Sequence, residues 1–250
     1  MEDFISIRKL HKTLGGHEVL CGVDLDVRSG ETLVVIGRSG GGKSVLLKHI
    51  IGLMKPTSGE VLVEGRNIVD LSERQLSAVR KKIGILFQSG ALFDSMSVEN
   101  NIAFPLIESG VRDQTIIDKK VAEVLEVVDL AGEQKVMPEN LSGGMKKRVG
   151  LARAIVGNPA CILYDEPTTG LDPIVADSIN HLIRRLQKRF QVTSIVVTHD
   201  MKSAFHVADQ VAYLYEGRIY LKGTAKELQA SNDPIIKNFI EGRSEYTEET

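Results

Sequence analysis

The stretch Gly37-Arg38-Ser39-Gly40-Gly41-Gly42-Lys43-Ser44 fits the pattern G-x-x-x-x-G-K-[ST], in which a glycine-rich loop binds phosphate. Glycines let the backbone turn several N–H groups toward an anion and approach it closely. We expect the ammonium group of Lys43 to contact the β- and γ-phosphates of a nucleotide, and the hydroxyl of Ser44 to ligate the Mg²⁺ that bridges them. The loop therefore predicts a nucleotide site.

The residues on both sides of this loop predict a buried strand followed by a helix. Residues 32–36 form a short, β-branched apolar run, which is typical of a strand covered on both faces. After the loop, apolar residues recur at helical spacing, and Lys55-Pro56 is expected to end that helix. The helix N-terminus then points at the phosphates. A chance glycine-rich turn is the alternative, and the strand and helix around the loop argue against it.

The composition is that of a folded protein and lacks the excess of basic residues that is typical of nucleic-acid binding. The 250 residues are 42% hydrophobic, enough for one large domain or two lobes. A net charge of −2, with no basic stripe among aromatics, predicts no nucleic-acid partner. Cys21 and Cys161 lie in apolar runs and are expected to be buried free thiols, which fits a reducing compartment. We find no signal peptide and no apolar run of about 20 residues, so membrane work is expected to go through a partner.

Residue periodicity predicts one α/β domain with a helical insertion. Residues up to Val27 alternate as short strands, which we expect to form an antiparallel sheet edge leading into the strand at 32–36. Residues 89–157 change to helical periodicity and are predicted to be a mostly helical lobe. The α/β core then comprises 1–88 and 158–240, and the acidic residues 241–250 are expected to be a frayed tail. Further strands are predicted at 59–65, 83–87, 160–164 and 194–197, and a hairpin at 211–221.

Charged residues follow two of these strands. Asp165 ends an apolar strand, where a phosphate-loop protein holds Mg²⁺, and Glu166 is placed to orient or deprotonate an attacking water. His199 also ends a strand, where it can contact the γ-phosphate. The alternatives are a turn-capping Asp-Glu pair and a structural histidine. Asp172 is predicted to cap a helix that begins with Pro173 and whose apolar face extends to Phe190.

A second stretch has the features of an anion site. Leu141-Ser142-Gly143-Gly144-Met145 precedes a helix predicted to begin near Lys146. The Ser142 hydroxyl and the glycine N–H groups at a helix N-terminus suit an anion. One chain with two phosphate sites needs an explanation.

These motifs, in this order and spacing, resemble those of the nucleotide-binding subunit of ABC transporters over nearly the full chain. Residues 37–44 are similar to its Walker A loop, Gln88 to its Q-loop glutamine and 141–145 to its signature. Residues 161–165 with Glu166 are similar to Walker B and the catalytic glutamate, 169–172 to the D-loop with Asp172, and His199 to the switch histidine.

The resemblance implies an α/β fold of the P-loop NTPase class, of ABC type, with a mixed sheet that has an antiparallel edge. It also implies an ATPase that uses ATP and Mg²⁺. It implies catalytic roles for Lys43, Glu166 and His199, and Mg²⁺ contacts from Ser44, Gln88 and Asp165. It also implies nucleotide contacts from residues 37–45, which include Arg38, Ser39, Gly40, Gly41, Gly42 and Val45.

The resemblance further implies the partners. Two copies pack head to tail, so that the signature of one closes on the ATP held by the other. The pair works with a multispanning permease on the cytoplasmic face of the inner membrane. Apolar residues after Gln88 are expected to form a groove for a permease helix, and packing in the core of the helical lobe is the alternative for each of them; these are Leu92, Phe93, Met96 and Phe104.

Departures from the family pattern narrow the resemblance. Leu14 stands where many relatives carry an aromatic that stacks on adenine, Val45 replaces a frequent threonine, and Met145 replaces the usual signature glutamine. With residues 87–98, Val45 and Met145 are similar to the Mla/Mce-type branch, which moves phospholipids with periplasmic lipid-binding and small accessory subunits. The alternatives are another transported cargo, a soluble ABC ATPase acting on a ribosome or DNA, and an inactive regulatory subunit. The presence of Lys43, Asp165, Glu166 and His199 argues against the last of these.

Overall fold

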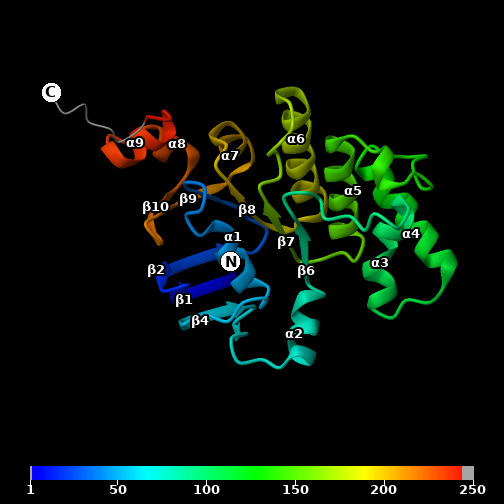
Figure 1. The fold of residues 1–250 in the computed structure, drawn as a ribbon, viewed down its shortest axis with the longest axis horizontal. Coiled ribbons are helices and arrows are strands. Elements are labelled where there is room, and N and C mark those ends of the chain that lie inside the picture. The colour runs from blue at the N-terminus through cyan, green and yellow to red at the C-terminus, as the bar shows by residue number, and fades with distance from the viewer. Residues whose placement is uncertain (1, 244–250) are drawn as a thin grey trace.

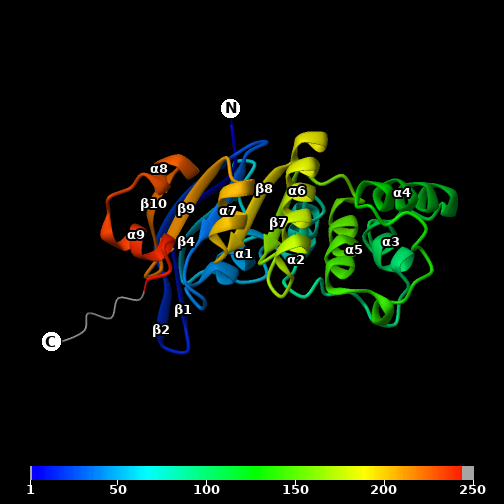
Figure 2. The same cartoon turned by 90° about the horizontal axis from the view of Figure 1, so that it is seen from above.

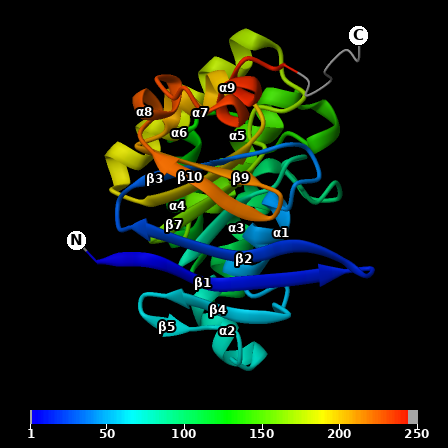
Figure 3. The ribbon, with the colours of Figure 1, turned by 90° about the vertical axis from the view of Figure 1, so that its left-hand side faces the viewer.

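The computed structural model describes residues 2–243 and has three layers, two sheets and a set of helices (Figures 1 and 3). The central six-stranded sheet has the order β10-β9-β3-β8-β7-β6. Its strands are β3 (Thr32–Ile36), β6 (Ile83–Leu86), β7 (Cys161–Asp165), β8 (Thr193–Thr198), β9 (Gln210–Tyr215) and β10 (Arg218–Gly223). Neighbouring strands are parallel from β9 to β6, and β10 pairs with β9 antiparallel. The expected α/β fold with a mixed sheet is confirmed.

Both faces of the central sheet are buried, as the apolar run of β3 predicts. Val34 and Ile36 join the core under the helices, whereas Leu33 and Val35 join the core under the second sheet. Side chains alternate across a strand, so a strand covered on both faces must be apolar at every position. All five residues of β3 are buried accordingly.

The N-terminal strands form a sheet of their own, which corrects the expectation that they lead into β3 as an edge. The second sheet has the order β2-β1-β4-β5 and is antiparallel. Its strands are β1 (Asp3–Leu14), β2 (His17–Arg28), β4 (Ser58–Val63) and β5 (Arg66–Asn67). It covers the central sheet because its inner face, including Ile5, Ile7 and Val61, shares one core with Leu33. Alternation alone predicts strands but does not say which strands pair.

The helix that follows the phosphate loop is shorter than predicted. Helix α1 (Lys43–Ile50) ends before Lys55-Pro56, because Gly52 takes a left-handed φ of +64° and the chain leaves the helix there. Leu53 is therefore 55% exposed instead of lying on a buried face. Helix α2 (Glu73–Arg80) is not anticipated by the sequence analysis, although Ser72 and Gln75 form a capping box at its start.

The segment between β6 and β7 is helical. It contains α3 (Val98–Glu108), α4 (Gln114–Val127), the 3₁₀ turn η1 (Pro138–Asn140) and α5 (Gly143–Ile155). These helices project from one side of the central sheet (Figures 1 and 2). The division of the chain at residues 88 and 158 stays a prediction.

The C-terminal part returns to the central sheet. Helix α6 (Pro173–Phe190) is capped by Asp172 and begins with Pro173, as predicted. Phe190, expected on its apolar face, is instead 41% exposed under the guanidinium of Arg189. Helices α7 (Met201–Val207), α8 (Ala225–Gln229) and α9 (Pro234–Ile240) complete the chain. Most of the expected tail at 241–250 lies outside the described residues. None of the helices within 2–243 has the length and apolarity that crossing a bilayer requires.

Candidate nucleotide site

Four neighbouring strands deliver the predicted motif residues to one edge of the central sheet. Strands β3, β8, β7 and β6 are parallel neighbours, so their carboxyl ends meet at the same edge. The phosphate loop follows β3, His199 follows β8, and Gln88 follows β6. Asp165 ends β7, with Glu166 next to it. The sequence shows each strand end, and the strand order brings the four together.

The phosphate loop needs its glycines for two different reasons. Gly40 and Gly42 have φ values of +75° and +96°, a left-handed region that strains other residues. Gly37 has an ordinary φ, but a Cβ added there would lie 2.6 Å from the carbonyl oxygen of Leu214. The loop therefore combines a required turn with close packing on β9.

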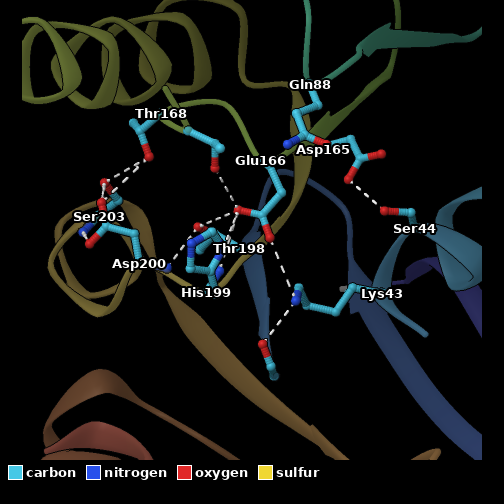
Figure 4. A network of polar contacts seen from close by, with 12 residues as sticks. Lys43, Ser44, Gln88, Asp165, Glu166, Thr168, Thr198, His199, Asp200 and Ser203 are labelled. Atoms are coloured by element: carbon cyan, nitrogen blue, oxygen red, sulfur yellow. Dashed lines mark hydrogen bonds and ion pairs between the residues drawn. The ribbon is translucent and has the colours of Figure 1, made fainter. Parts of the chain in front are cut away.

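Lys43 and Ser44 face the two acidic residues at the end of β7 (Figure 4). The buried Nζ of Lys43 donates to the carbonyls of Gly37 and Arg38 at 2.8 and 3.1 Å. It also lies 3.5 Å from Oε1 of Glu166. The Ser44 hydroxyl donates to Oδ1 of Asp165 at 2.9 Å. Residues 121 positions apart in the sequence thus share one polar cluster.

Glu166 is the most constrained side chain of this cluster (Figure 4). It is buried and has a left-handed φ of +49°, which is uncommon outside glycine. Its Oε2 accepts hydrogen bonds from the hydroxyls of Thr169 and Thr198 at 3.1 and 3.2 Å. Nδ1 of His199 lies 3.0 Å from the same oxygen, and it carries the proton there because a carboxylate only accepts.

The two neighbouring carboxyl groups differ in their pKa values. Burial is the largest influence on Asp165 and raises its pKa, against the opposing hydrogen bond from Ser44. Burial is also the largest influence on Glu166, but His199, Lys43 and Thr169 together outweigh it and lower the pKa of that carboxyl. Glu166 therefore stays ionised more readily than Asp165, although the two are adjacent.

Lys147 is part of this site, and the sequence analysis missed it. It lies on α5 and is 4% exposed. Its Nζ donates to the carbonyl of Glu166 at 3.0 Å and to the carbonyl of Gln88. Burial lowers the pKa of Lys147 to about 8, even though the charges of Asp165 and Glu166 raise it. The sequence gives no local signal for this burial, which follows from the packing of α5.

The second predicted anion site lies apart from the first. Ser142 caps α5 and accepts a hydrogen bond from the backbone N–H of Met145 at 3.3 Å. Ser142 and Gly143 are exposed, while Gly144 packs so closely on α6 that an added Cβ would lie 2.5 Å from Val175. Helices α1 and α5 stand apart with β7 between them (Figures 1 and 2). The chain thus presents an exposed helix N-terminus separately from its phosphate loop.

Asp172 has a structural role within its own chain, at the start of α6. Its Oδ1 accepts hydrogen bonds from the backbone N–H groups of Ile174 and Val175, both at 3.0 Å. This is the N-cap that the sequence predicts. A contact of Asp172 with a second copy stays a prediction.

A groove of about 860 Å³ lies between α2, β6 and α3. Its apolar wall includes the exposed rings of Phe87 and Phe93 together with Phe104. Leu92 and Met96, which were expected to line such a groove, are half-buried and do not line it. Glu108 and four basic residues also line the groove; the basic residues are Arg80, Lys81, Lys120 and Arg153.

Comparison with protein families agrees with these motifs. The ABC transporter family model matches residues 20–169. A probable ribonucleotide transport ATP-binding protein, Mkl of Mycobacterium leprae, is 39% identical over 96% of this chain and 69% of its own length. MlaF of Haemophilus influenzae, the ATP-binding protein of an intermembrane phospholipid transport system, is 39% identical over 98% of this chain and 92% of its own length.

A solved structure has the same fold. The ATP-binding cassette MJ0796, in a dimeric post-hydrolysis state with ADP and Pi, aligns with a TM-score of 0.81 and 32% identity. The alignment covers 88% of this chain and 98% of that cassette.

Proposed function

The chain belongs to the ABC transporter family and is an ATPase of that family, and we propose that it powers the movement of phospholipid or a related lipid across a cell envelope. One observation carries the catalytic part of this proposal. The buried carboxylate of Glu166 lies between Lys43 and His199, at the edge where the phosphate loop begins. A charged base and a phosphate-binding cation in one cluster suit attack of water on a γ-phosphate.

The residues divide the work of nucleotide binding. Lys43 and the backbone of residues 37–42 hold the phosphates, and Ser44 and Val45 lie in the first turn of the helix whose N-terminus faces them. The sequence offers Leu14 near the expected base, and it is 37% exposed at the end of β1. A leucine lacks the π-face of an aromatic ring, so the proposal includes weak selection of adenine.

Mg²⁺ fits the oxygen donors at the end of β7. Ser44 Oγ and Asp165 Oδ1 lie 2.9 Å apart, and both are the hard oxygen ligands that this ion prefers. Burial raises the pKa of Asp165, so the hydrogen bond from Ser44 and the nearby lysines do not fully offset the cost of burying its negative charge. A bound cation would offset that cost. Ser44 and Asp165 would hold the ion, with Gln88 as a further oxygen donor. When bound, Mg²⁺ neutralises charge that develops on the phosphates.

Glu166 is the proposed base, and its neighbours set its charge and direction. His199, Thr169 and Thr198 all donate to Oε2. Oε1 is left toward Lys43, on the side of the phosphate loop. An ionised carboxylate fixed in this way can orient a water and take its proton without first rearranging.

The test of this role is Glu166→Gln, which keeps the shape and removes the charge. We expect ATP to bind, hydrolysis to fall by roughly 10²–10⁴, and closed dimers to accumulate with ATP. Glu123→Gln on the exposed face of α4 is the matched control and should hydrolyse ATP normally. Normal turnover by Glu166→Gln, measured as phosphate release, would remove Glu166 from the proposal.

The exposed signature supports a head-to-tail dimer. Ser142 at the start of α5 offers a hydroxyl and a helix N-terminus to an anion, and the phosphate loop of its own chain lies elsewhere. We propose that these residues, 141–145, complete the ATP site of a second copy. The solved MJ0796 cassette is itself described as a dimer.

The aromatic groove is the proposed contact with a membrane permease. An amphipathic helix of the permease would place apolar side chains against Phe87, Phe93 and Phe104, and acidic ones against the surrounding Arg and Lys residues. The proposed location is the cytoplasmic face of the inner membrane, with periplasmic lipid-binding and accessory subunits as further components. No nucleic-acid partner is proposed.

The cargo needs its own test, because the two relatives above are named for different cargoes. Similarity to MlaF supports phospholipid, whereas Mkl is named for ribonucleotide transport. We would deplete the chain in its host and compare the phospholipid content of the membranes with the uptake of labelled ribonucleotides. A change in phospholipid distribution with unchanged ribonucleotide uptake supports the proposal, and the reverse pattern refutes it. Co-purification of a multispanning membrane protein would also exclude a soluble, non-transport ATPase.

A further inference from the structure

Helix α5 is attached to the strand-end residues of the site along one of its faces. Lys147, Gly150 and Arg153 follow each other at intervals of three residues, so they share that face. A Cβ added to Gly150 would lie 2.7 Å from Leu86 and 3.4 Å from the carbonyl oxygen of Gly90. Arg153 donates to the carbonyls of Gly90 and Ala91 at 2.7 and 2.8 Å. The loop after β6 is therefore held against α5 at several points.

Lys147 is the attachment point nearest the proposed chemistry. Its side chain is buried, and its ammonium joins the carbonyl of Gln88, after β6, to the carbonyl of Glu166, after β7. Both carbonyls belong to residues just beyond strand ends, Gln88 after β6 and Glu166 after β7. A buried ammonium is costly unless it is hydrogen-bonded, so these two bonds favour this mutual arrangement of the helix, the loop and Glu166.

The backbone of Glu166 makes this contact consequential. Its left-handed φ of +49° persists only if the surroundings over-determine it. Its N–H donates to Val197 at 2.9 Å, and its carbonyl accepts from Lys147 at 3.0 Å. Both backbone polar groups of this strained residue are thus hydrogen-bonded to other elements, the N–H to β8 and the carbonyl to α5.

We propose that Lys147 is a positioning residue that aims the Glu166 carboxylate and holds Gln88 beside it, linking the signature helix to the hydrolysis site of its own chain. The inference rests on the proposed role of Glu166. It explains why a lysine is buried at the fifth residue of a helix whose own N-terminus faces outward. Within the described residues, the hydrogen bonds of Lys147 go to two backbone carbonyls, so replacing its side chain removes no group of the phosphate loop at 37–44.

The test is a double-mutant cycle in the 250-residue chain. Lys147→Met keeps the apolar stem and removes the ammonium group. Misplacing a catalytic group by about 1 Å can cost about 10²-fold, so we expect Lys147→Met to lower kcat by about 10- to 100-fold. The KM for ATP and the affinity for ATP in calorimetry should stay within about twofold, because the loop at 37–44 is unchanged. Lys119→Met, which removes an exposed lysine of α4, is the matched control.

Measuring Lys147→Met with and without Glu166→Gln separates a positioning role from a general loss of activity. If Lys147 acts through Glu166, Lys147→Met should cost less than about threefold in single-turnover hydrolysis once Glu166→Gln is present. Lys147→Arg, which retains charge and several donors, should recover most of the lost kcat. An equal loss in both backgrounds, an unchanged kcat, or an Arg variant as slow as the Met variant would each overturn the inference. Normal turnover by Glu166→Gln alone would instead refute the role proposed for Glu166.

Thermal unfolding distinguishes this result from a folding defect. Lys147→Met leaves two carbonyls without their donor, so some loss of stability is expected. If that variant does not fold, Lys147→Gln offers a shorter amide donor, and the same cycle with Glu166→Gln decides the question. A loss of kcat that appears only when Glu166 is intact supports positioning, and a loss independent of Glu166 contradicts it.

Discussion

The cluster at the phosphate loop and the signature at the start of α5 are the two proposed anion sites, and they differ in how many hydrogen bonds and ion pairs their side chains make within one chain. At the loop, five side chains contact one another or the backbone through distances of 2.8–3.5 Å; these are Lys43, Ser44, Asp165, Glu166 and His199. At the signature, Ser142 is exposed and makes one capping bond to Met145. The first site is preorganised within one chain, whereas the second presents its donors outward, which is what a site completed by another molecule requires.

The largest expected effects come from removing one group from each site. Lys43→Met should lower ATP turnover by about 10²–10³, because a preorganised cation at the phosphates is lost. Lys48→Met, on the exposed side of the same helix, is its control. Ser142→Ala should reduce turnover by about 10² while one copy still binds ATP, since it removes a donor proposed to act on the other copy. Steady-state phosphate release and ATP titration measure both variants.

Ser142→Ala also removes a helix cap, and a control variant measures how much the resulting loss of stability lowers turnover. Loss of a serine N-cap costs about 1 kcal/mol of stability. Ser97→Ala removes the equivalent cap of α3 and should cost a similar amount without affecting turnover. If Ser97→Ala slows hydrolysis as much as Ser142→Ala does, the signature acts by stability alone.

A smaller but more specific effect is expected from mixing the two inactive variants. In a head-to-tail dimer of one Lys43→Met chain and one Ser142→Ala chain, one site keeps both a normal loop and a normal signature. With equal amounts, about half of the dimers are mixed, and each has one complete site of two, so about a quarter of normal activity should return. Failure to recover any activity, in a mixture shown to exchange subunits, would contradict composite sites.

The smallest expected effect concerns how α5 is held on the core. Oδ2 of Asp129, just after α4, accepts from Arg148 on α5 at 2.7 Å and from Arg185 on α6 at 2.8 Å. Arg185 is the main cause of the lowered pKa of Asp129, with Arg148 also contributing. The carboxylate is about half exposed, so Asp129→Asn should cost no more than about 1 kcal/mol at neutral pH.

The pH dependence of this contact has a defined sign. A folded pKa below the unfolded value of about 3.9 means that the contribution is fully present above that pH. It is then lost as the pH falls through the lowered folded pKa. In urea unfolding at pH 7, Asp129→Asn should therefore be less stable than the unchanged chain. The free energies of unfolding of the two chains should converge in acid. A difference that persists in acid would assign the stability to packing. Asparagine also tolerates the left-handed φ of +58° at this position.

The anticipated parts of the site are those carried by contiguous residues. The loop at 37–44, the strand ends at Asp165 and His199, and the cap by Asp172 each follow from neighbours in the sequence. Lys147 could not be anticipated, because its burial depends on α5 packing against loops about 20 and 60 residues away. The early end of α1 was missed for a different reason, since Gly52 is a local signal that the prediction gave less weight than Pro56.

What the sequence by itself determined is the set of local geometries: a buried strand, a glycine loop, a helix N-terminus and carboxyl groups at strand ends. Each depends on the conformational preferences of a few consecutive residues. What only the tertiary structure decided is which of them meet. The strand order β3-β8-β7-β6 places Lys43, His199, Glu166 and Gln88 at one edge, and the N-terminal strands form a separate sheet. Hydrogen bonds to β8 and to Lys147 hold the backbone of Glu166 in a left-handed conformation. Contacts between distant segments decide these features, because a strained residue and a buried ammonium persist only where packing and hydrogen bonds from several elements compensate them.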